Sequence, residues 1–182
     1  MMNIKFVTGL FVNTAFASLF TCASFAQIAP NNSSFFTGNP PSLVSVQTPD
    51  NSINWPYPHY YFTISIPSNS IESVGKVTIF PQVGPSSVTF DINSTQASLG
   101  SNINRLGKSI PLTASQSSDG LISVKFNQPI PPGTTFTIVL EPAQNPSIDG
   151  IYQYTVSVFP SGSNTVGLDL GVGRISIYSF SR

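Results

Sequence analysis

Side chains able to act as an acid, a base or a nucleophile are scarce in this sequence of 182 residues. His59 is the only histidine, and a Ser-His-Asp hydrolase would need it as the general base. Serines are numerous, but none lies in a G-x-S-x-G nucleophile elbow. His59 stands between Pro58 and Tyr60, where a strand is expected to begin. We therefore predict a structural role for His59 rather than a catalytic one.

Metal ligands are equally sparse. Zinc sites use histidine and cysteine, and Cys22 is the single cysteine, so no zinc site is predicted. Calcium takes oxygen ligands from scattered loops, and Asp119, Asp149 and Asp169 all fall at expected turns. The first two precede a glycine, and Asp-Gly is a common turn pair for local reasons. A calcium site and plain turn chemistry both remain open here, and no cofactor is assigned.

The aromatic residues Trp55, Tyr57, Tyr60 and Tyr61 are the strongest indication of binding. Exposed rings near a sheet edge can stack on the sugars of an envelope polysaccharide or anchor another envelope protein. In the alternative interpretation, Trp55 and Tyr57 hold a proline-rich arm across the domain, and Tyr60 points into the core. The binding candidates are therefore Trp55, Tyr57 and Tyr61.

Arg174 is a further candidate, because cations are few and it stands between a glycine and the last expected strand. It can bind an acidic group of a ligand or pair with Asp169 or Glu141 inside the fold. We expect the internal pair, with Glu141 placed for it at a strand end before Pro142.

The charge composition excludes one class of partner. Charged residues make up 8% of the chain, and seven Lys and Arg balance seven Asp and Glu. No basic stripe is present to neutralise phosphates, so nucleic-acid binding is not expected.

The N-terminus has the pattern of a signal peptide. Lys5 is followed by a mostly apolar stretch over residues 6–20, and small residues lie at the −3 and −1 positions of a cleavage between Ala26 and Gln27. The stretch is short of the roughly 20 apolar residues that span a membrane. Cys22 has a poor lipobox context, so lipidation is not expected. We predict a signal over residues 1–26 and an exported protein, periplasmic or extracellular, without a transmembrane segment after cleavage.

Removal of the signal also removes the only cysteine, which leaves a chain without disulfides. Disulfides are usual in eukaryotic secreted domains, so a bacterial envelope or extracellular protein fits better.

The rest of the chain divides into a proline-rich arm and a strand-rich domain. Residues 27–58 read as an irregular arm in which only residues 43–46 form a short edge strand. Residues 59–182 show period-two alternation between proline and glycine stops, typical of seven or eight short antiparallel strands. We expect residues 93–109 to be a long loop. The side chains expected to face the core are Tyr60, Phe62, Ile64, Ile66, Val77, Ile79, Val88, Phe90, Ile92, Ile122, Val124, Phe126, Phe136, Ile138, Leu140, Tyr152, Tyr154, Val156, Val158, Ile175 and Ile177.

A tyrosine placed just after a turn indicates which β architecture this is. Tyr152 comes two residues after Gly150, at the start of a strictly alternating strand. In immunoglobulin-like sandwiches such a tyrosine forms the tyrosine corner, in which its hydroxyl bonds to backbone a few residues upstream. Tyr154 stands where those domains have their second disulfide cysteine. The sequence therefore predicts a cysteine-free, all-β, immunoglobulin-like sandwich.

The C-terminal half resembles a known family. The blocks PPGTT, PAQNP, GIY, FPSG and GVGRISIY come in the family's order at residues 131–135, 142–146, 150–152, 159–162 and 171–178. The chain is thus similar to exported cyanobacterial proteins that carry domain of unknown function 2808. The resemblance covers roughly residues 59–178 and implies an exported domain. It implies no catalytic residues. Within these blocks, Pro132, Gly133 and Gly150 are expected to be structural.

Three functions remain open at this point. The first is a non-catalytic structural or ligand-binding domain of the bacterial envelope or exterior. The second is an envelope hydrolase whose site is assembled from loop carboxylates or serines, which would require His59, Arg174 and acidic side chains to converge. The third is a subunit of a surface polymer, for which residues 43–46 are the candidate donor strand.

Overall fold

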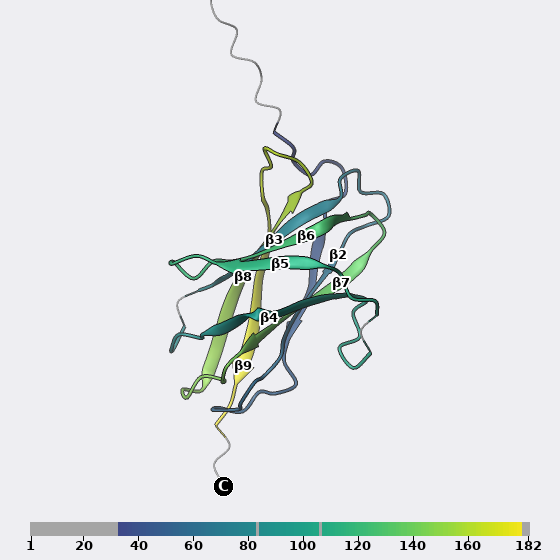
Figure 1. Cartoon of the computed structure of the whole chain (residues 1–182). Helices are drawn as coiled ribbons and strands as arrows, with labels where there is room; N and C mark the ends of the chain where they lie inside the picture. The colour runs from purple at the N-terminus through teal and green to yellow at the C-terminus, as the bar shows by residue number, and fades with distance from the viewer. Residues whose placement is uncertain (1–32, 83, 106, 180–182) are drawn as a thin grey trace, which may run out of the picture. The chain divides into compact units, whose positions relative to one another are not determined.

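The computed structural model describes residues 33–82, 84–105 and 107–179, and all regular structure in them is β. The expected cleavage between Ala26 and Gln27 lies outside the described residues. Two antiparallel sheets face each other (Figure 1). Their strands are β1 (Ser42–Gln47), β2 (Tyr60–Ser65), β3 (Val74–Pro81), β4 (Phe90–Leu99), β5 (Leu112–Gln116), β6 (Ile122–Ile130), β7 (Thr135–Pro142), β8 (Gly150–Pro160) and β9 (Leu168–Ile177).

The strand order confirms an immunoglobulin-like sandwich. One sheet has the order β1-β2-β7-β4 and the other β5-β6-β3-β8-β9. The first corresponds to strands A, B, E and D of an immunoglobulin domain, and β3, β8 and β9 correspond to C, F and G. The hairpin of β5 and β6 is inserted between D and E, and β6 extends the second sheet beside β3.

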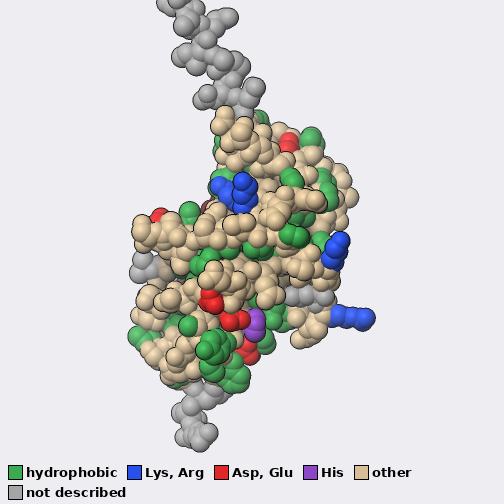
Figure 2. All heavy atoms as spheres, in the orientation of Figure 1, with side chains coloured by type: hydrophobic (Ala, Val, Ile, Leu, Met, Phe, Trp, Pro, Cys, Tyr) green, Lys and Arg blue, Asp and Glu red, His purple; other side chains and the backbone are tan. Residues whose placement is uncertain are grey.

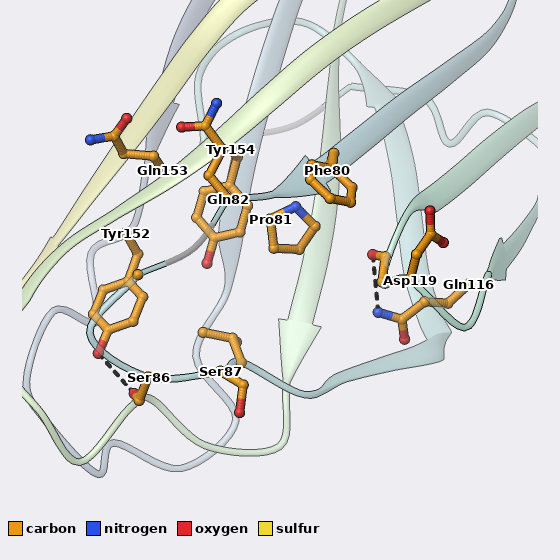
Figure 3. A pocket seen from close by; sticks show the side chains of 13 residues that line it. Phe80, Pro81, Gln82, Ser86, Ser87, Gln116, Asp119, Tyr152, Gln153 and Tyr154 are labelled. Atoms are coloured by element: carbon orange, nitrogen blue, oxygen red, sulfur yellow. Dashed lines mark hydrogen bonds between the residues drawn. The ribbon is translucent and has the colours of Figure 1, made fainter.

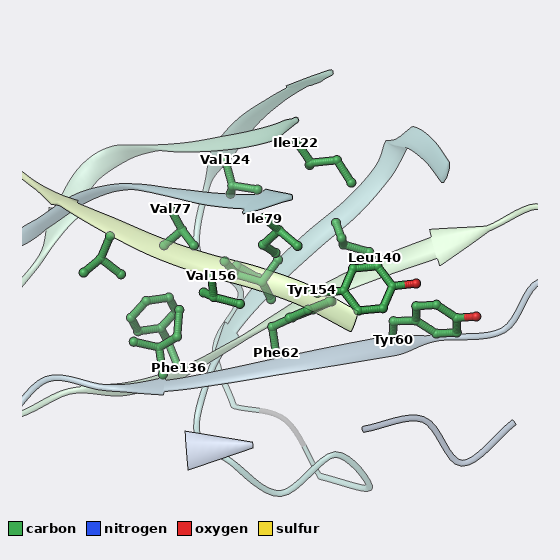
Figure 4. Packing of buried hydrophobic residues seen from close by; sticks show 14 of the residues in the cluster. Tyr60, Phe62, Val77, Ile79, Ile122, Val124, Phe136, Leu140, Tyr154 and Val156 are labelled. Atoms are coloured by element: carbon green, nitrogen blue, oxygen red, sulfur yellow. The ribbon is translucent and has the colours of Figure 1, made fainter. Parts of the chain in front are cut away.

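The core lies between the two sheets, where alternate side chains of each strand point inward (Figure 4). Tyr154 packs edge-on against Phe62, Tyr60 and Phe90, with ring centroids 5.6, 6.0 and 6.2 Å apart. Every side chain expected to face the core belongs to this cluster or packs against it. Alternation was sufficient to identify the core side chains, because each strand turns only one of its two faces toward the other sheet.

One strand and most of another were missing from the sequence prediction. Residues 93–99 extend β4 where a long loop was expected, and β5 was not predicted, so the count is nine strands rather than seven or eight. Both are outermost in their sheets, and their sequences NSTQASL and LTASQ are largely polar. In β4 only Thr95 and Ala97 of this stretch are buried, so no apolar stripe marks it.

The strands around Ile122 and Phe136 follow each other in the chain but do not pair with each other. β6 pairs with β3, and β7 pairs with β2, so the proline-rich connection crosses from one sheet to the other. The Gly133 N–H donates to the carbonyl oxygens of Ile66 and Pro67, at 3.0 and 3.1 Å. Gly133 has φ +77°, which a side chain would strain. This crossing turn, which follows Pro132, is thereby fixed to the end of β2.

The segment expected to be an irregular arm contains β1 in its described part. β1 pairs with β2, placing Val46 opposite Phe62, and forms the edge of the four-stranded sheet. It is the short edge strand expected at residues 43–46. The sandwich therefore extends N-terminal to residue 59.

Tyr152 makes the hydrogen bond of a tyrosine corner. It is buried near the start of β8, and its hydroxyl donates to the carbonyl oxygen of Ile148 at 2.8 Å. The Ser86 hydroxyl lies 3.0 Å from the Tyr152 hydroxyl oxygen. Gly150 is the first residue of β8, and a Cβ there would approach the Pro85 ring to 2.8 Å. The start of β8 therefore packs tightly against the connection between β3 and β4.

Replacing Tyr152 by phenylalanine tests this corner. Loss of its hydrogen bond should lower the free energy of unfolding by about 0.5–1.5 kcal/mol, measured by chemical denaturation. Tyr154→Phe is the matched control, because the buried Tyr154 hydroxyl has no hydrogen-bond partner among the described residues. Its removal should leave stability unchanged or raise it. Equal losses in both variants would contradict a specific role for the Tyr152 hydroxyl.

Candidate functional site

The arm segment, defined here as residues 50–57, is fixed to the end of the sandwich by backbone hydrogen bonds. Two of them join it to the connection after β7: Tyr57 donates to Ala143 at 3.1 Å, and Trp55 accepts from Asn145 at 2.8 Å. Another joins it to the residue after β9, since Ile53 donates to Tyr178 at 2.9 Å. The arm segment is therefore held along its length.

The Asn145 side chain connects this segment to the core. Asn145 is 3% exposed, and its amide nitrogen donates to the carbonyl oxygens of Asp50 and Ser52 at 2.6 and 2.8 Å. Its amide oxygen accepts from the Tyr60 hydroxyl at 2.8 Å. Burial raises the Tyr60 pKa well above its usual range, so this hydroxyl stays protonated and remains a donor. One buried amide thus links the arm segment, the connection after β7, and β2.

Two aromatic side chains of the arm segment are exposed by this arrangement. Trp55 is 47% exposed and Tyr57 is 65% exposed. Tyr57 has φ +46° and Asn54 has φ +56°, a region that non-glycine residues rarely adopt. Such backbone persists only where surrounding contacts determine it, and it clusters at functional sites. Both interpretations of the aromatic residues therefore meet here: the segment is pinned, and its rings still face outward.

An uncharged hollow is lined in part by Asn54, the residue before Trp55. It has a volume of about 310 Å³ and includes Asn54, Ser86, Ser87, Thr89 and Gln144 in its lining, with no ionisable side chain among its lining residues. The Gln144 amide donates to the backbone and side-chain oxygens of Asn54, each at 3.2 Å. We call this the amide–hydroxyl hollow. The side chains that line it can both donate and accept hydrogen bonds, and none of them is charged.

A second hollow, of about 430 Å³, lies next to the tyrosine corner (Figure 3). Phe80, Pro81 and Val88 line it together with Tyr152 and Tyr154, so much of its wall is aromatic or aliphatic. Ser86 and Ser87 line both hollows, which are therefore adjacent.

His59 and Tyr61 lie along β2 next to the arm segment. His59 is paired with Glu141, its Nε2 3.3 Å from a carboxylate oxygen, and its ring lies 6.2 Å from that of Tyr61. In Figure 2 the single histidine stands among acidic side chains, directly beside a group of hydrophobic ones. Tyr61 is half-buried, and desolvation raises its pKa.

The internal ion pair expected for Arg174 is wrong, because Glu141 pairs with His59 instead. Arg174 is exposed on β9, opposite Gln153 of β8, in the sheet that does not contain His59. It lines a shallow hollow of about 210 Å³ with residues of the β1 end, including Gln47 and Thr48. The structure therefore does not bring Arg174 together with Trp55, Tyr57 and Tyr61.

The three aspartates considered for calcium make separate local contacts. Asp119 accepts from the Ser117 hydroxyl, which lowers its pKa, Asp169 accepts from the Gly171 N–H at 2.7 Å, and Asp149 accepts from Ser179. Within the described ranges no three Asp, Glu, His or Cys residues come together as metal ligands would. The described residues also include no helix long and apolar enough to cross a membrane.

The fold and these contacts define an immunoglobulin-like β-sandwich domain with an N-terminal segment pinned across one end. Its sequence matches the family described as "Protein of unknown function (DUF2808)" over residues 33–177, and the chain belongs to that family. The match includes most of the segment expected to be an arm, consistent with the place of β1 in the sheet. No curated protein matches the chain.

Three bacterial proteins are among the solved structures to which the chain is similar. The collagen-binding domain of a Staphylococcus aureus adhesin is 10% identical, covers 79% of this chain and 98% of its own, and has a TM-score of 0.40. The bacterial hydrophobin BslA is 15% identical over 79% and 97%, with a TM-score of 0.44. MyfA of Yersinia enterocolitica, the major subunit of Myf fimbriae, is 11% identical over 73% and 96%, with a TM-score of 0.34. We transfer no function from similarities this low.

Asn145 was missed by sequence reasoning, although it lies in the PAQNP block that carries the family resemblance. An asparagine before a proline reads as a turn residue, and its three partners lie 85 to 95 positions away in the chain. Its position within a family block was the available signal.

Asn145→Ala tests how far the arm segment depends on this side chain. The substitution leaves the buried Tyr60 hydroxyl and the carbonyl groups of two half-buried residues without this partner, so the free energy of unfolding should fall by about 2–4 kcal/mol. Gln144→Ala is the matched control, because Gln144 is exposed and its bonds stay within the surface. It should change stability by about 0.5 kcal/mol or less. Similar values for both variants would show that Asn145 is not the anchor.

Proposed function

We propose that this protein is an exported, non-catalytic binding domain of the bacterial envelope or exterior, and that its ligand is a neutral polysaccharide. The binding surface consists of Trp55 and Tyr57, the amide–hydroxyl hollow, and Tyr61. Export rests on the signal pattern of residues 1–26, and a cyanobacterial source rests on the resemblance of the sequence blocks.

One observation carries the proposal: Trp55 is half-exposed and directly follows Asn54, which lines an uncharged hollow, on a segment that Asn145 holds in place. Sugar rings present apolar faces and many hydroxyl groups. An exposed indole offers a flat apolar face, and the amides and hydroxyls of the hollow can donate to or accept from hydroxyl groups. The absence of charged lining residues in the hollow favours a neutral glycan over an acidic one.

Fixing the segment in advance also favours binding. A loop that must become ordered on binding loses affinity through its conformational entropy, whereas a pre-organised one does not. The arm segment is already hydrogen-bonded to Ala143, Asn145 and Tyr178.

The alternative function, an envelope hydrolase, has less support. Such a site requires His59, Arg174 and carboxylates in one cleft. His59 borders the four-stranded sheet, whereas Arg174 lies on β9 of the other sheet. His59 is occupied by Glu141, and that pair lies on the surface rather than in a cleft. This separation supports binding without catalysis.

Retention of the mature protein on insoluble neutral polysaccharides, with cellulose and starch as separate probes, tests the proposal. The wild type should be retained by at least one of them, and Trp55→Ala should lower its affinity about tenfold or more, because central aromatic residues dominate binding energy. Phe35→Ala is the matched control. Phe35 is 56% exposed and lies beside Ser34, which bridges to Thr165 after β8, at the opposite end of that strand.

Equal retention of wild type and Trp55→Ala would reject the aromatic surface as the glycan site. Failure on both glycans, together with Trp55-dependent capture of an envelope protein, would show that the partner is a protein instead.

A further inference from the structure

A fourth hollow lies on the five-stranded sheet, at the other end of β8 from the arm segment. Its volume is about 450 Å³, and its lining includes Lys76 of β3, Lys125 and Asn127 of β6, and Ser161 and Ser163 after β8. We call it the lysine hollow. β8 has eleven residues, so at roughly 3.3 Å per residue the two ends are about 30 Å apart. Figure 2 shows basic side chains gathered at a recess on this side of the molecule.

The two lysines are direct neighbours across the sheet. Lys76 and Lys125 are Cα partners in the pairing of β3 with β6, so both side chains project from the same face. Like charges directly opposite each other destabilise an antiparallel pair. The chain has only seven Lys and Arg residues, so two of them in this arrangement are a notable local concentration of charge.

No carboxylate offsets this charge. Within the part of the chain that the structure describes, the one ion pair is that of His59 with Glu141, so neither lysine has an acidic oxygen within 4.0 Å. The lining of the lysine hollow contains no Asp or Glu. Its polar side chains besides the lysines carry amide and hydroxyl groups, which can donate hydrogen bonds to a ligand in the hollow.

The backbone and one aromatic ring position Lys76. The pairing of β3 with both β6 and β8 shifts register between Val74 and Lys76, so a β-bulge directly precedes the lysine. Bulges of this kind re-aim side chains and are common next to functional sites. The Lys76 ammonium lies 3.8 Å from the centroid of the Phe159 ring, a cation–π contact that holds the charge at the hollow.

From these contacts we infer that the lysine hollow is a binding site for a sulfate-like oxyanion, either free or carried as an ester on a glycan. Two ammonium groups would share the anion, and the hydroxyl and amide groups of Ser161, Ser163 and Asn127 would donate to its remaining oxygens. The bound anion would remove the repulsion between Lys76 and Lys125. This site is separate from the proposed neutral-glycan surface and does not depend on it.

Thermal melting of the mature protein tests the inference with inorganic sulfate as the probe. Melting temperatures are compared in sodium sulfate and sodium chloride at equal ionic strength, because sulfate also stabilises proteins by general exclusion. The variants are Lys76→Gln combined with Lys125→Gln, and Lys108→Gln, which removes one positive charge from a loop residue that does not line the lysine hollow. The extra stabilisation by sulfate should vanish in the double variant and persist in Lys108→Gln.

Retention on immobilised dextran sulfate, with dextran as the uncharged matrix, separates the two sources of the anion. The mature protein lacks Lys5 and so carries six Lys and Arg against seven Asp and Glu, a net charge of −1, and its retention must therefore come from a local site. Each lysine substitution should weaken retention about tenfold, as loss of one charge-assisted hydrogen bond does. Loss of both the sulfate effect and retention in the double variant identifies a glycan ester, whereas loss of the sulfate effect alone identifies a free anion.

Two results would overturn the inference. The first is that the double variant and Lys108→Gln behave alike in both measurements. The second is that Lys125→Gln melts at a lower temperature than the wild type in sulfate-free buffer, because the lysines would then stabilise the fold themselves. Neither result bears on retention by cellulose or starch, which involves the other end of β8.

Discussion

The structure at the candidate site depends on one buried amide. The Asn145 side chain accepts from Tyr60, which belongs to the core, and donates to two carbonyl groups of the segment that carries Trp55. Buried polar groups are costly unless every donor and acceptor is paired, and here the amide uses both nitrogen hydrogens and its oxygen. The geometry of the surface is therefore determined from inside the sandwich. Exposed aromatic rings on an otherwise irregular segment thus have defined positions.

The sandwich separates two kinds of surface chemistry. At the end formed by the arm segment, Trp55 and Tyr57 are exposed, and Asn54 of the same segment lines a hollow that lacks ionisable groups. At the other end of β8, Lys76 and Lys125 share a recess that lacks carboxylates. A rigid strand joins the two, and the core between them contributes no chemistry to either. A domain with both surfaces is suited to contact a polymer or matrix at two points rather than to transform a small substrate.

The fold was accessible from the sequence wherever strands bury one face. The stripes from Tyr60 to Ile177 and the corner at Tyr152 follow from alternation and a turn signal, and both are present. β5 and the second half of β4 were not accessible, because edge strands with few buried side chains lack an apolar period. The partners of β6 and β7 could not be assigned from the sequence for another reason: in a Greek-key arrangement, closeness in the chain does not decide which strands pair.

The candidate site was only partly predictable. The aromatic cluster around Trp55 stood out by composition, and its exposure agrees with a binding role. The partner of Glu141 did not follow from the sequence, since nothing in the spacing distinguishes His59 from Arg174. Asn145 and the lysine pair depend on contacts across strands that are distant in the chain, and these appear only once the register is known.

Trp55 is the only tryptophan, so its fluorescence reports on one place in the molecule. Titration of the mature protein with soluble oligosaccharides of cellulose and starch, followed by tryptophan emission, is the most direct test of the central claim. We predict a saturable blue shift with at least one of the two series, since a sugar ring stacked on the indole would exclude water from it. Saturable binding measured by calorimetry without any change in emission would contradict the claim that Trp55 forms the binding surface.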